Sequence, residues 1–195
     1  MSSRENILNA ISTNKPLFTE LPLLDLNEVT AYEDLPAQFR KALLNNGGQV
    51  FDLLDIQELE TNIREEIKSG KIVLNMLNGT SVISENTNYH QAVVALETLD
   101  KVYLKSELGV AENGAVWIGE SEINNRLLPF ICQHLVIVLE KEKLVATMHQ
   151  AYQRMNHRRE GFGVFIAGPS KTADIEQSLV IGAHGARSMT VYLLP

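Results

Sequence analysis

The chain has 195 residues, 45% of them hydrophobic and 21% charged, a composition typical of a folded globular protein rather than a disordered or fibrous one. Its formal net charge of −7 argues against a nucleic-acid surface, because phosphate binding requires clustered lysine and arginine. The acidic excess lies in residues 1–100, which carry 7 basic and 15 acidic groups, whereas residues 101–195 carry 10 basic and 9 acidic groups. The charge of the second half is therefore compatible with binding of a small anionic ligand.

The first 45 residues predict an N-terminal appendage, followed by an α/β domain over residues 46–195. Residues 3–12 predict a short amphipathic helix that begins at a serine cap. Residues 13–29 contain prolines and isolated apolar residues, a pattern typical of an extended arm that lies over the protein or over a partner chain. Residues 34–48 predict a second helix, with a proline in its first turn and a glycine pair at its end.

Strands and helices alternate in the rest of the chain. Seven apolar runs rich in β-branched and aromatic residues predict strands: QVFDLL, KIVLNML, VYLK, AVWIG, HLVIVLE, FGVFIAG and MTVYLL. Helices are predicted between several of them, at residues 55–70, 143–155 and 172–183. The alternation predicts an α/β fold built on a mainly parallel sheet flanked by helices.

The segment GPSKTADIE follows a predicted strand and is expected to begin a helix, at the edge where parallel sheets bind ligands. Gly168 allows a close backbone approach, Ser170 or Thr172 would cap the helix, and Lys171 would place a positive charge beside the free N–H groups. Asp174 would either complement the helix dipole or contact the ligand. These residues predict a site for a carboxylate or phosphate. The fingerprints of ATP- and dinucleotide-binding loops are absent.

Two further groups are candidates for chemistry. Glu112 and Asn113 precede the predicted strand AVWIG, where an unpaired buried carboxylate would be costly, so Glu112 either acts in function or stabilises the turn. Arg126 is a plausible counter-charge for Glu112. His184 lies between glycines in GAHGAR, where its ring either faces a pocket or bonds the last carbonyls of the predicted helix. We predict Glu112 and His184 as catalytic residues, and Asn113 and Arg126 as ligand contacts.

The sequence gives no support for a resident metal or cofactor. Cys132 is the single cysteine, which excludes an intramolecular disulfide and a cysteine-based zinc or iron–sulfur site, and its apolar neighbours predict a buried thiol. The histidines lack the spacing of metal-ligand pairs. No signal peptide is recognisable, and no run approaches the ~18 apolar residues that span a bilayer. We expect a cytoplasmic protein that does not contact membranes.

Several of these segments together resemble the LUD-domain family: GVAENGAVWIGES, RLLP, HLVIVLE, GPSKTADIE and GAHGARSMTVYLL. The resemblance is strong over residues 80–195 and loose before them. It implies a Rossmann-like fold of the NagB/RpiA/CoA-transferase type and a role in oxidising L-lactate to pyruvate beside iron–sulfur partner subunits. Any clusters would belong to those partners, since this chain lacks the cysteines to hold them.

The sequence departs from the family pattern at four positions. Asn113 and Ala115 replace threonines, Lys171 replaces an arginine, and Ala186 replaces a proline. Lysine keeps the positive charge but lacks the two-pronged guanidinium that grips a carboxylate. The ligand can therefore differ from that of the usual members.

Three functional classes follow from the sequence. The first is an accessory or small-anion-binding subunit of an L-lactate oxidation system. The second is a CoA-transferase-like enzyme, since Glu112-Asn113-Gly114 resembles the tripeptide around the nucleophilic glutamate of family I CoA-transferases, although their glycine-rich oxyanion segment is not apparent. The third is a binding or regulatory module for a small acid. The N-terminal arm is compatible with a homodimer.

Overall fold

The computed structural model describes most of the chain, namely residues 2–20, 22, 25, 31–77, 96, 98–123, 125–155, 161–173, 179–182 and 184–195. Within these residues, no helix combines the length and the apolar character that a membrane span requires.

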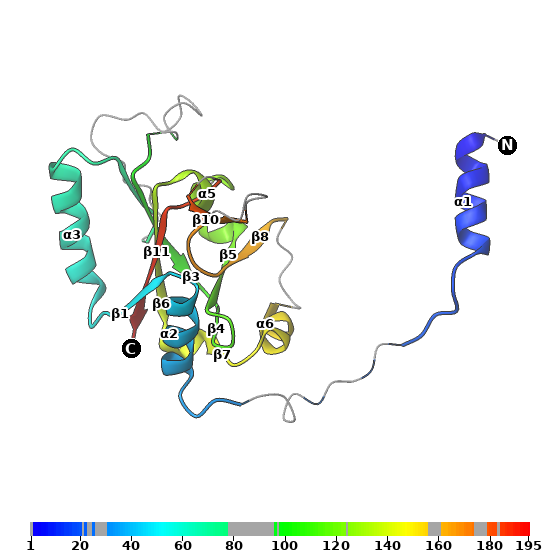
Figure 1. The fold of residues 1–195 in the computed structure, drawn as a ribbon, viewed down its shortest axis with the longest axis horizontal. Coiled ribbons are helices and arrows are strands. Elements are labelled where there is room, and N and C mark those ends of the chain that lie inside the picture. The colour runs from blue at the N-terminus through cyan, green and yellow to red at the C-terminus, as the bar shows by residue number, and fades with distance from the viewer. Residues whose placement is uncertain are drawn as a thin grey trace.

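The centre of the molecule is a five-stranded parallel sheet (Figure 1). Its strands, in spatial order, are β1 (Gln49–Asp52), β11 (Ser188–Leu194), β6 (His134–Glu140), β3 (Lys101–Ser106) and β2 (Val73–Asn75). All four pairings between them are parallel. The predicted α/β fold with a mainly parallel sheet is therefore confirmed.

Two of the predicted strands lie outside this sheet. A second, four-stranded sheet contains β7 (Leu144–Val145), β4 (Gly109–Val110), β5 (Ala115–Gly119) and β8 (Gly163–Ile166), in that order. Here β5 pairs antiparallel with both β4 and β8. AVWIG and FGVFIAG are strands, as predicted, but they lie in this second sheet, where the tight turn between β4 and β5 permits only antiparallel pairing of those two strands.

Helices and the second sheet cover the two faces of the parallel sheet. On one face lies α3 (Ile56–Lys68), which packs Leu59 and Ile63 against β2, β3 and β6. On the other face lie α2 (Leu35–Asn45), the short α5 (Leu128–Ile131) and the second sheet, with α6 (Met148–Met155) packed on the far side of that sheet. Figure 1 shows this layering, with α3 and α6 at opposite sides of the body.

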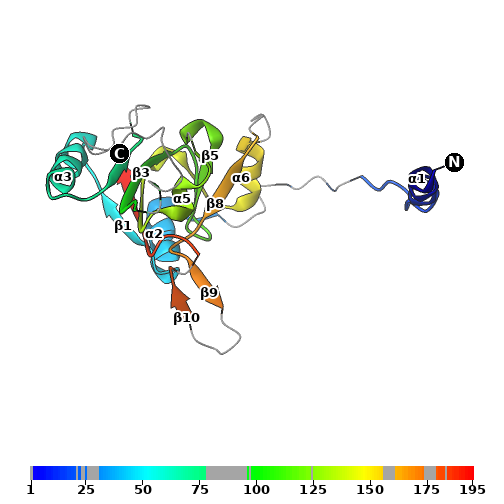
Figure 2. The same cartoon turned by 90° about the horizontal axis from the view of Figure 1, so that it is seen from above.

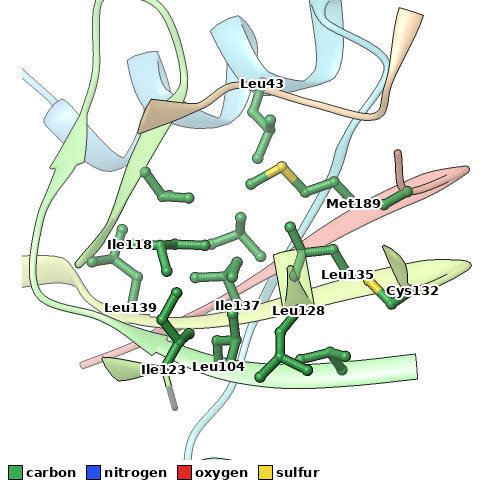
Figure 3. Close-up of a cluster of buried hydrophobic side chains, with 14 of the residues drawn as sticks. Leu43, Leu104, Ile118, Ile123, Leu128, Cys132, Leu135, Ile137, Leu139 and Met189 are labelled. Carbon is green, nitrogen blue, oxygen red and sulfur yellow. The ribbon is translucent and has the colours of Figure 1, made fainter. Parts of the chain in front are cut away.

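The main core fills the space between the two sheets and α2. Figure 3 shows Leu43 of α2 pointing toward Met189 of β11, with Ile118 of the second sheet and Ile137 of the first below them. These side chains are fully buried. Cys132 lies in the same cluster, as predicted, and its burial raises the pKa of the thiol to about 12, so the group stays protonated and unreactive at neutral pH.

The N-terminal helix stands apart from this body. The helix α1 (Ser3–Thr13) begins with a capping box in which Ser2 and Glu5 each accept a backbone N–H of the other, but it buries no residue. Figures 1 and 2 show it clear of the sheets. In the arm that follows, Leu17 and Phe18 are 95% and 89% exposed. The described part of the arm therefore does not lie over its own domain.

The second helix belongs to the body. It begins at Asp34, whose side chain accepts the N–H of Ala37, and it places Phe39 and Leu43 in the main core. Sequence analysis assigns this helix to the N-terminal appendage. The boundary at residue 45 stays a prediction, but these contacts attach α2 to the α/β domain.

The predicted helix over residues 172–183 is wrong. The described residues of this segment form an antiparallel hairpin of β9 (Lys171–Ala173) and β10 (Leu179–Ile181), which projects from the body in Figure 2. Threonine, valine and isoleucine in this segment favour strands, and the capping residues that suggested a helix start are equally common in turns. The helix predicted over 143–155 is right only from Met148, since its first residues form β7.

A contact between a glycine and the single tryptophan yields a stability prediction. A Cβ atom at Gly163 would lie 1.9 Å from Cζ2 of Trp117, whose ring packs against Phe165 at a centroid distance of 4.9 Å. We expect Gly163→Ala to destabilise the fold by about 1–3 kcal/mol, because the added methyl would push the rigid indole out of its packing against Phe165. Urea unfolding followed by Trp117 fluorescence measures this.

Gly161→Ala is the matched control. Its Cβ would meet the end of the Glu120 side chain, at 2.9 Å from Oε2, and that carboxylate can shift at little cost. Equal stability of the two variants would contradict the proposed packing.

Glu66 gives a pH-dependent contribution to stability. Burial alone would raise the pKa of this carboxyl, but hydrogen bonds from Lys101 and Tyr103 and the charges of Lys101 and Lys71 bring it below its ordinary value of 4.5. A depressed pKa stabilises the fold at higher pH, and this stabilisation disappears as pH falls below 4.5 through the folded-state pKa. We expect Glu66→Gln to be less stable than the parent at pH 7 and to converge with it in acid. Chemical denaturation across pH tests this, with exposed Glu65→Gln as the control.

Candidate functional site

Glu112 lies in the turn between β4 and β5 and reaches the start of α6. Its Oε1 atom accepts the backbone N–H of Met148 at 2.6 Å, and its own N–H donates to the carbonyl of Ala146 at 3.0 Å. Met148 is the first residue of α6, so the carboxylate satisfies one of the free N–H groups there and complements the helix dipole. This contact supports the turn-stabilising interpretation of Glu112. Its catalytic role stays a prediction.

Arg126 has a different partner from the one expected. Its guanidinium binds Oε1 of Glu120 through two N–H groups, at 2.6 and 3.0 Å, and lies over the ring of Phe162. The structure therefore places Arg126 on Glu120 instead of Glu112. Its assignment as a ligand contact stays a prediction.

The turn that contains Glu112 rests directly on α2. The carbonyl of Asn113 accepts the side-chain amide of Asn46 at 2.8 Å, and the Asn113 side chain accepts the N–H of Ala115. Gly114 has a φ of +70°, and a Cβ there would lie 2.6 Å from the backbone nitrogen of Leu43. Only glycine combines this φ with so close an approach to a helix backbone.

The Gly168 turn meets the same end of α2. Gly168 has a φ of +95°, and a Cβ there would lie 2.6 Å from the carbonyl oxygen of Asn46. Its N–H points at the sulfur of Met189, and Pro169 lies beside Gly47. Asn46 therefore touches both segments that the sequence singles out. Sequence analysis missed this residue, because NNGG at residues 45–48 signals only the end of a helix.

The residues after Gly168 form the base of the β9–β10 hairpin, together with the segment that contains His184. We define the hairpin base as Ser170, Lys171, Gly182, Gly185 and Arg187. Two hydrogen bonds fix its backbone. The Gly182 N–H donates to the Ser170 carbonyl at 3.0 Å, and the Ser170 N–H donates to the Ala186 carbonyl at 2.9 Å.

Small residues let the two segments of the hairpin base approach each other closely. The Cβ position of Gly185 lies 3.3 Å from the Ser170 hydroxyl, and that of Gly182 lies 2.4 Å from Cγ of Arg187. Lys171 pairs with Ile181, the neighbour of Gly182, and both Lys171 and Arg187 are exposed. The hairpin base thus presents a hydroxyl and two cations to solvent. Arg187 is a functional candidate that the sequence-based prediction did not include, although it is the last residue of the motif GAHGAR that contains His184.

The remaining predicted residues fall around the hairpin base or outside the described chain. His184 is exposed in the loop between β10 and β11, so the alternative in which its ring bonds the last carbonyls of a helix is wrong, because the described residues before it form the strand β10. Thr172 lies in β9, in register with Val180. Asp174 lies outside the described residues. Whether His184, Thr172 and Asp174 contact a ligand stays a prediction.

The hairpin base lies at the amino edge of the parallel sheet. The Arg187 N–H donates to the carbonyl of Gln133, and β11 and β6 begin at the next residues, Ser188 and His134. The expectation of a site at the carboxyl edge is therefore wrong. It assumed that the strand before Gly168 belongs to the parallel sheet, whereas β8 lies in the second sheet, and the chain that leaves it returns to the start of β11.

Among the residues that the structure describes, no group of three or more histidine, cysteine, aspartate or glutamate side chains is placed to hold a metal ion. The hairpin base offers a ligand hydrogen-bond donors and positive charge. These are the groups that bind oxyanions.

The LUD domain family matches residues 94–194, which include the Glu112 turn and the hairpin base. The match spans more than half of the chain, and the chain belongs to the LUD domain family.

Named relatives match a similar stretch. The chain is 35% identical over 95 residues to a protein of Bacillus pumilus named Lactate utilization protein C, a match that covers 46% of this chain and 39% of the relative. A protein of Shouchella clausii with the same name is 31% identical over 106 residues, with 52% of this chain and 46% of the relative covered. The chain thus matches less than half the length of these relatives.

A solved structure shares the fold. The crystal structure of a DUF162 family protein from Deinococcus radiodurans superposes with a TM-score of 0.56 at 15% sequence identity, over 89% of this chain and all of that one. At this identity the likeness concerns the architecture alone.

The capping role of Glu112 can be measured. We expect Glu112→Ala to destabilise the fold by about 1–2 kcal/mol, because the N–H of Met148 at the start of α6 loses its acceptor. Glu112→Gln should cost less, since an amide oxygen still accepts the bond. Urea denaturation of the three proteins gives the order, and an alanine variant as stable as the parent would refute the cap.

Proposed function

We propose that this protein acts in lactate utilisation, as a subunit that binds a small anion at the hairpin base and works beside iron–sulfur partner subunits in the oxidation of L-lactate to pyruvate. The names of the relatives and membership in the LUD domain family support a role in lactate utilisation. The observation that carries the site is the close contact between two segments of the family region, one with Ser170 and Lys171 and the other with Gly182, Gly185 and Arg187.

The chemistry of the hairpin base suits a carboxylate. Lys171 and Arg187 supply positive charge at exposed positions, and the Ser170 hydroxyl supplies a neutral donor. In our proposal Lys171 and Arg187 hold the carboxylate of the ligand and His184 orients it or accepts a proton. The chain's own residues bind and position the ligand, and electron transfer belongs to the partners.

The N-terminal helix supports the proposed association with partners. Ile7, Leu8 and Ile11 of α1 are each about half exposed, although they form the apolar side of the helix. An amphipathic helix that covers nothing in its own domain is suited to dock on another protein. In our proposal α1 binds an iron–sulfur subunit, and a second copy of this chain is the alternative.

Thermal unfolding with L-lactate and pyruvate tests the anion site. A ligand that binds the native state at 100 times its Kd stabilises it by about 2.7 kcal/mol, which raises the melting temperature by several degrees. We expect Lys171→Ala to abolish the rise and Lys41→Ala, an exposed lysine of α2, to keep it. A rise of equal size in the parent and the Lys171→Ala variant would place the ligand elsewhere.

The CoA-transferase alternative has a separate test. It requires Glu112 to attack an acyl-CoA, yet the carboxylate is held by the N-terminus of α6. Incubation with acyl-CoAs followed by mass spectrometry distinguishes the two functions, since a thioester on Glu112 would replace the proposed binding role with catalysis. We expect no adduct.

A further inference from the structure

A second pocket lies at the amino edge of the parallel sheet, on the α3 side. It has a volume of about 280 Å³, and its lining includes Gln49, His134, Ser188, Thr190 and Tyr192. The register explains this grouping: His134 and Ser188 face each other across β6 and β11, and Gln49 is opposite Thr190 in β1 and β11. Side chains two apart on a strand share a face.

The α3 helix leaves this part of the face open. Its apolar side packs over Tyr103, Val136 and Val138, whereas Phe51 of the edge strand β1 remains 48% exposed. Among the described elements, α3 is the helix packed on this side of the sheet. In β11 the residues facing the main core are fully buried and apolar, but those facing the pocket alternate with them and begin with Ser188 and Thr190.

The polar groups in the pocket are partly engaged with one another. Nδ1 of His134 lies 2.7 Å from the hydroxyl of Ser188. The carboxylate of Asp100 accepts the backbone N–H of Ile72 at 2.9 Å. The Glu66 carboxylate, at the back, binds Lys101 and the Tyr103 hydroxyl. The carboxylates of Glu66 and Asp100 are therefore occupied by donors of the protein itself.

Three cations lie near the pocket. Lys71 lines it, is 51% exposed, and reaches Glu66 only at 3.7 Å. Lys101 lines it as well, and Arg187 lies close enough to act on His134. Glu58 acts electrostatically on Tyr192, which also lines the pocket, so the three carboxylates near the pocket balance these three cations, and Lys71 is the half-exposed cation of the lining.

We propose that this pocket binds an oxyanion, the carboxylate or phosphate group of a small hydroxylated molecule, between Lys71 and the His134–Ser188 pair. Gln49 and Thr190 face the remaining space and would bond the hydroxyl groups of the ligand. The site differs from the hairpin base in its lysine, which is Lys71 instead of Lys171, although Arg187 lies near both, and the proposal does not depend on lactate utilisation.

The protonation state of His134 reports on this site. Burial, helped by the charges of Lys101, Lys71 and Arg187 and opposed by Asp100, lowers the pKa of the imidazole, so it is neutral at pH 7 in the free protein. A bound anion reverses the effect of the cations and raises that pKa, and by linkage the anion binds more tightly as pH falls. Tyr103 and Tyr192 have raised pKa values and stay neutral in this range.

The test is an NMR titration of the His134 ring in the full chain, with and without three probes: glycerate, glycerol 3-phosphate and glycerol. We expect at least one of the two anions to raise the pKa of His134 by about 1. Glycerol, which has the hydroxyls without the charge, should leave it unchanged. A response to glycerate alone identifies a carboxylate site, and a response to glycerol 3-phosphate alone identifies a phosphate site. No response to either anion overturns the proposal.

Two variants test whether the anion binds to Lys71 itself or responds only to the overall charge of the protein. Lys71→Gln should weaken the binding of the responding anion about tenfold, whereas Lys68→Gln, an exposed lysine on the last turn of α3, should not. Equal weakening by both variants overturns the proposal, because it would reflect only the overall charge. Lys171→Ala should leave the His134 titration unchanged, so failure of the hairpin-base site and failure of this pocket are distinguishable.

Discussion

The structure depends on the close packing of two glycine turns against the last turn of α2. Gly114 meets the backbone of Leu43 and Gly168 meets the carbonyl of Asn46, each at a distance that excludes a side chain. The Asn46 side chain adds a hydrogen bond to the first of these turns. Because α2 also fills the main core, this contact fixes the second sheet and the hairpin base relative to the parallel sheet. The conformational freedom of glycine is needed at both turns.

The two faces of the parallel sheet are filled differently. The face toward α2 and the second sheet is a continuous apolar core, in which Met189, Val191 and Leu193 are fully buried. The face toward α3 is apolar only where that helix covers it, and becomes polar at the start of β6 and β11. A strand buried on both sides is apolar throughout, so the alternation in SMTVYLL already indicates one incompletely covered face.

A carboxylate in a family motif need not be catalytic. Glu112 combines a glycine turn, partial burial and a place just before a strand, which are features of an active-site acid as well as of a structural one. The N-terminus of α6, 36 residues later, provides a backbone N–H that offsets the cost of burying the carboxylate. A sequence does not show such a partner, because the distance along the chain does not reveal which helix will begin beside the turn.

The sequence by itself determined the class of the fold, the cores of most strands and helices, and the family motifs. It did so because apolar periodicity and cap residues act locally. Only the tertiary structure decided that β5 and β8 form a second sheet, that residues 171–181 contain a hairpin, and that Arg126 pairs with Glu120. Strand pairing and ion pairing join residues distant in sequence, and local propensity cannot choose between partners that only the assembled fold brings together.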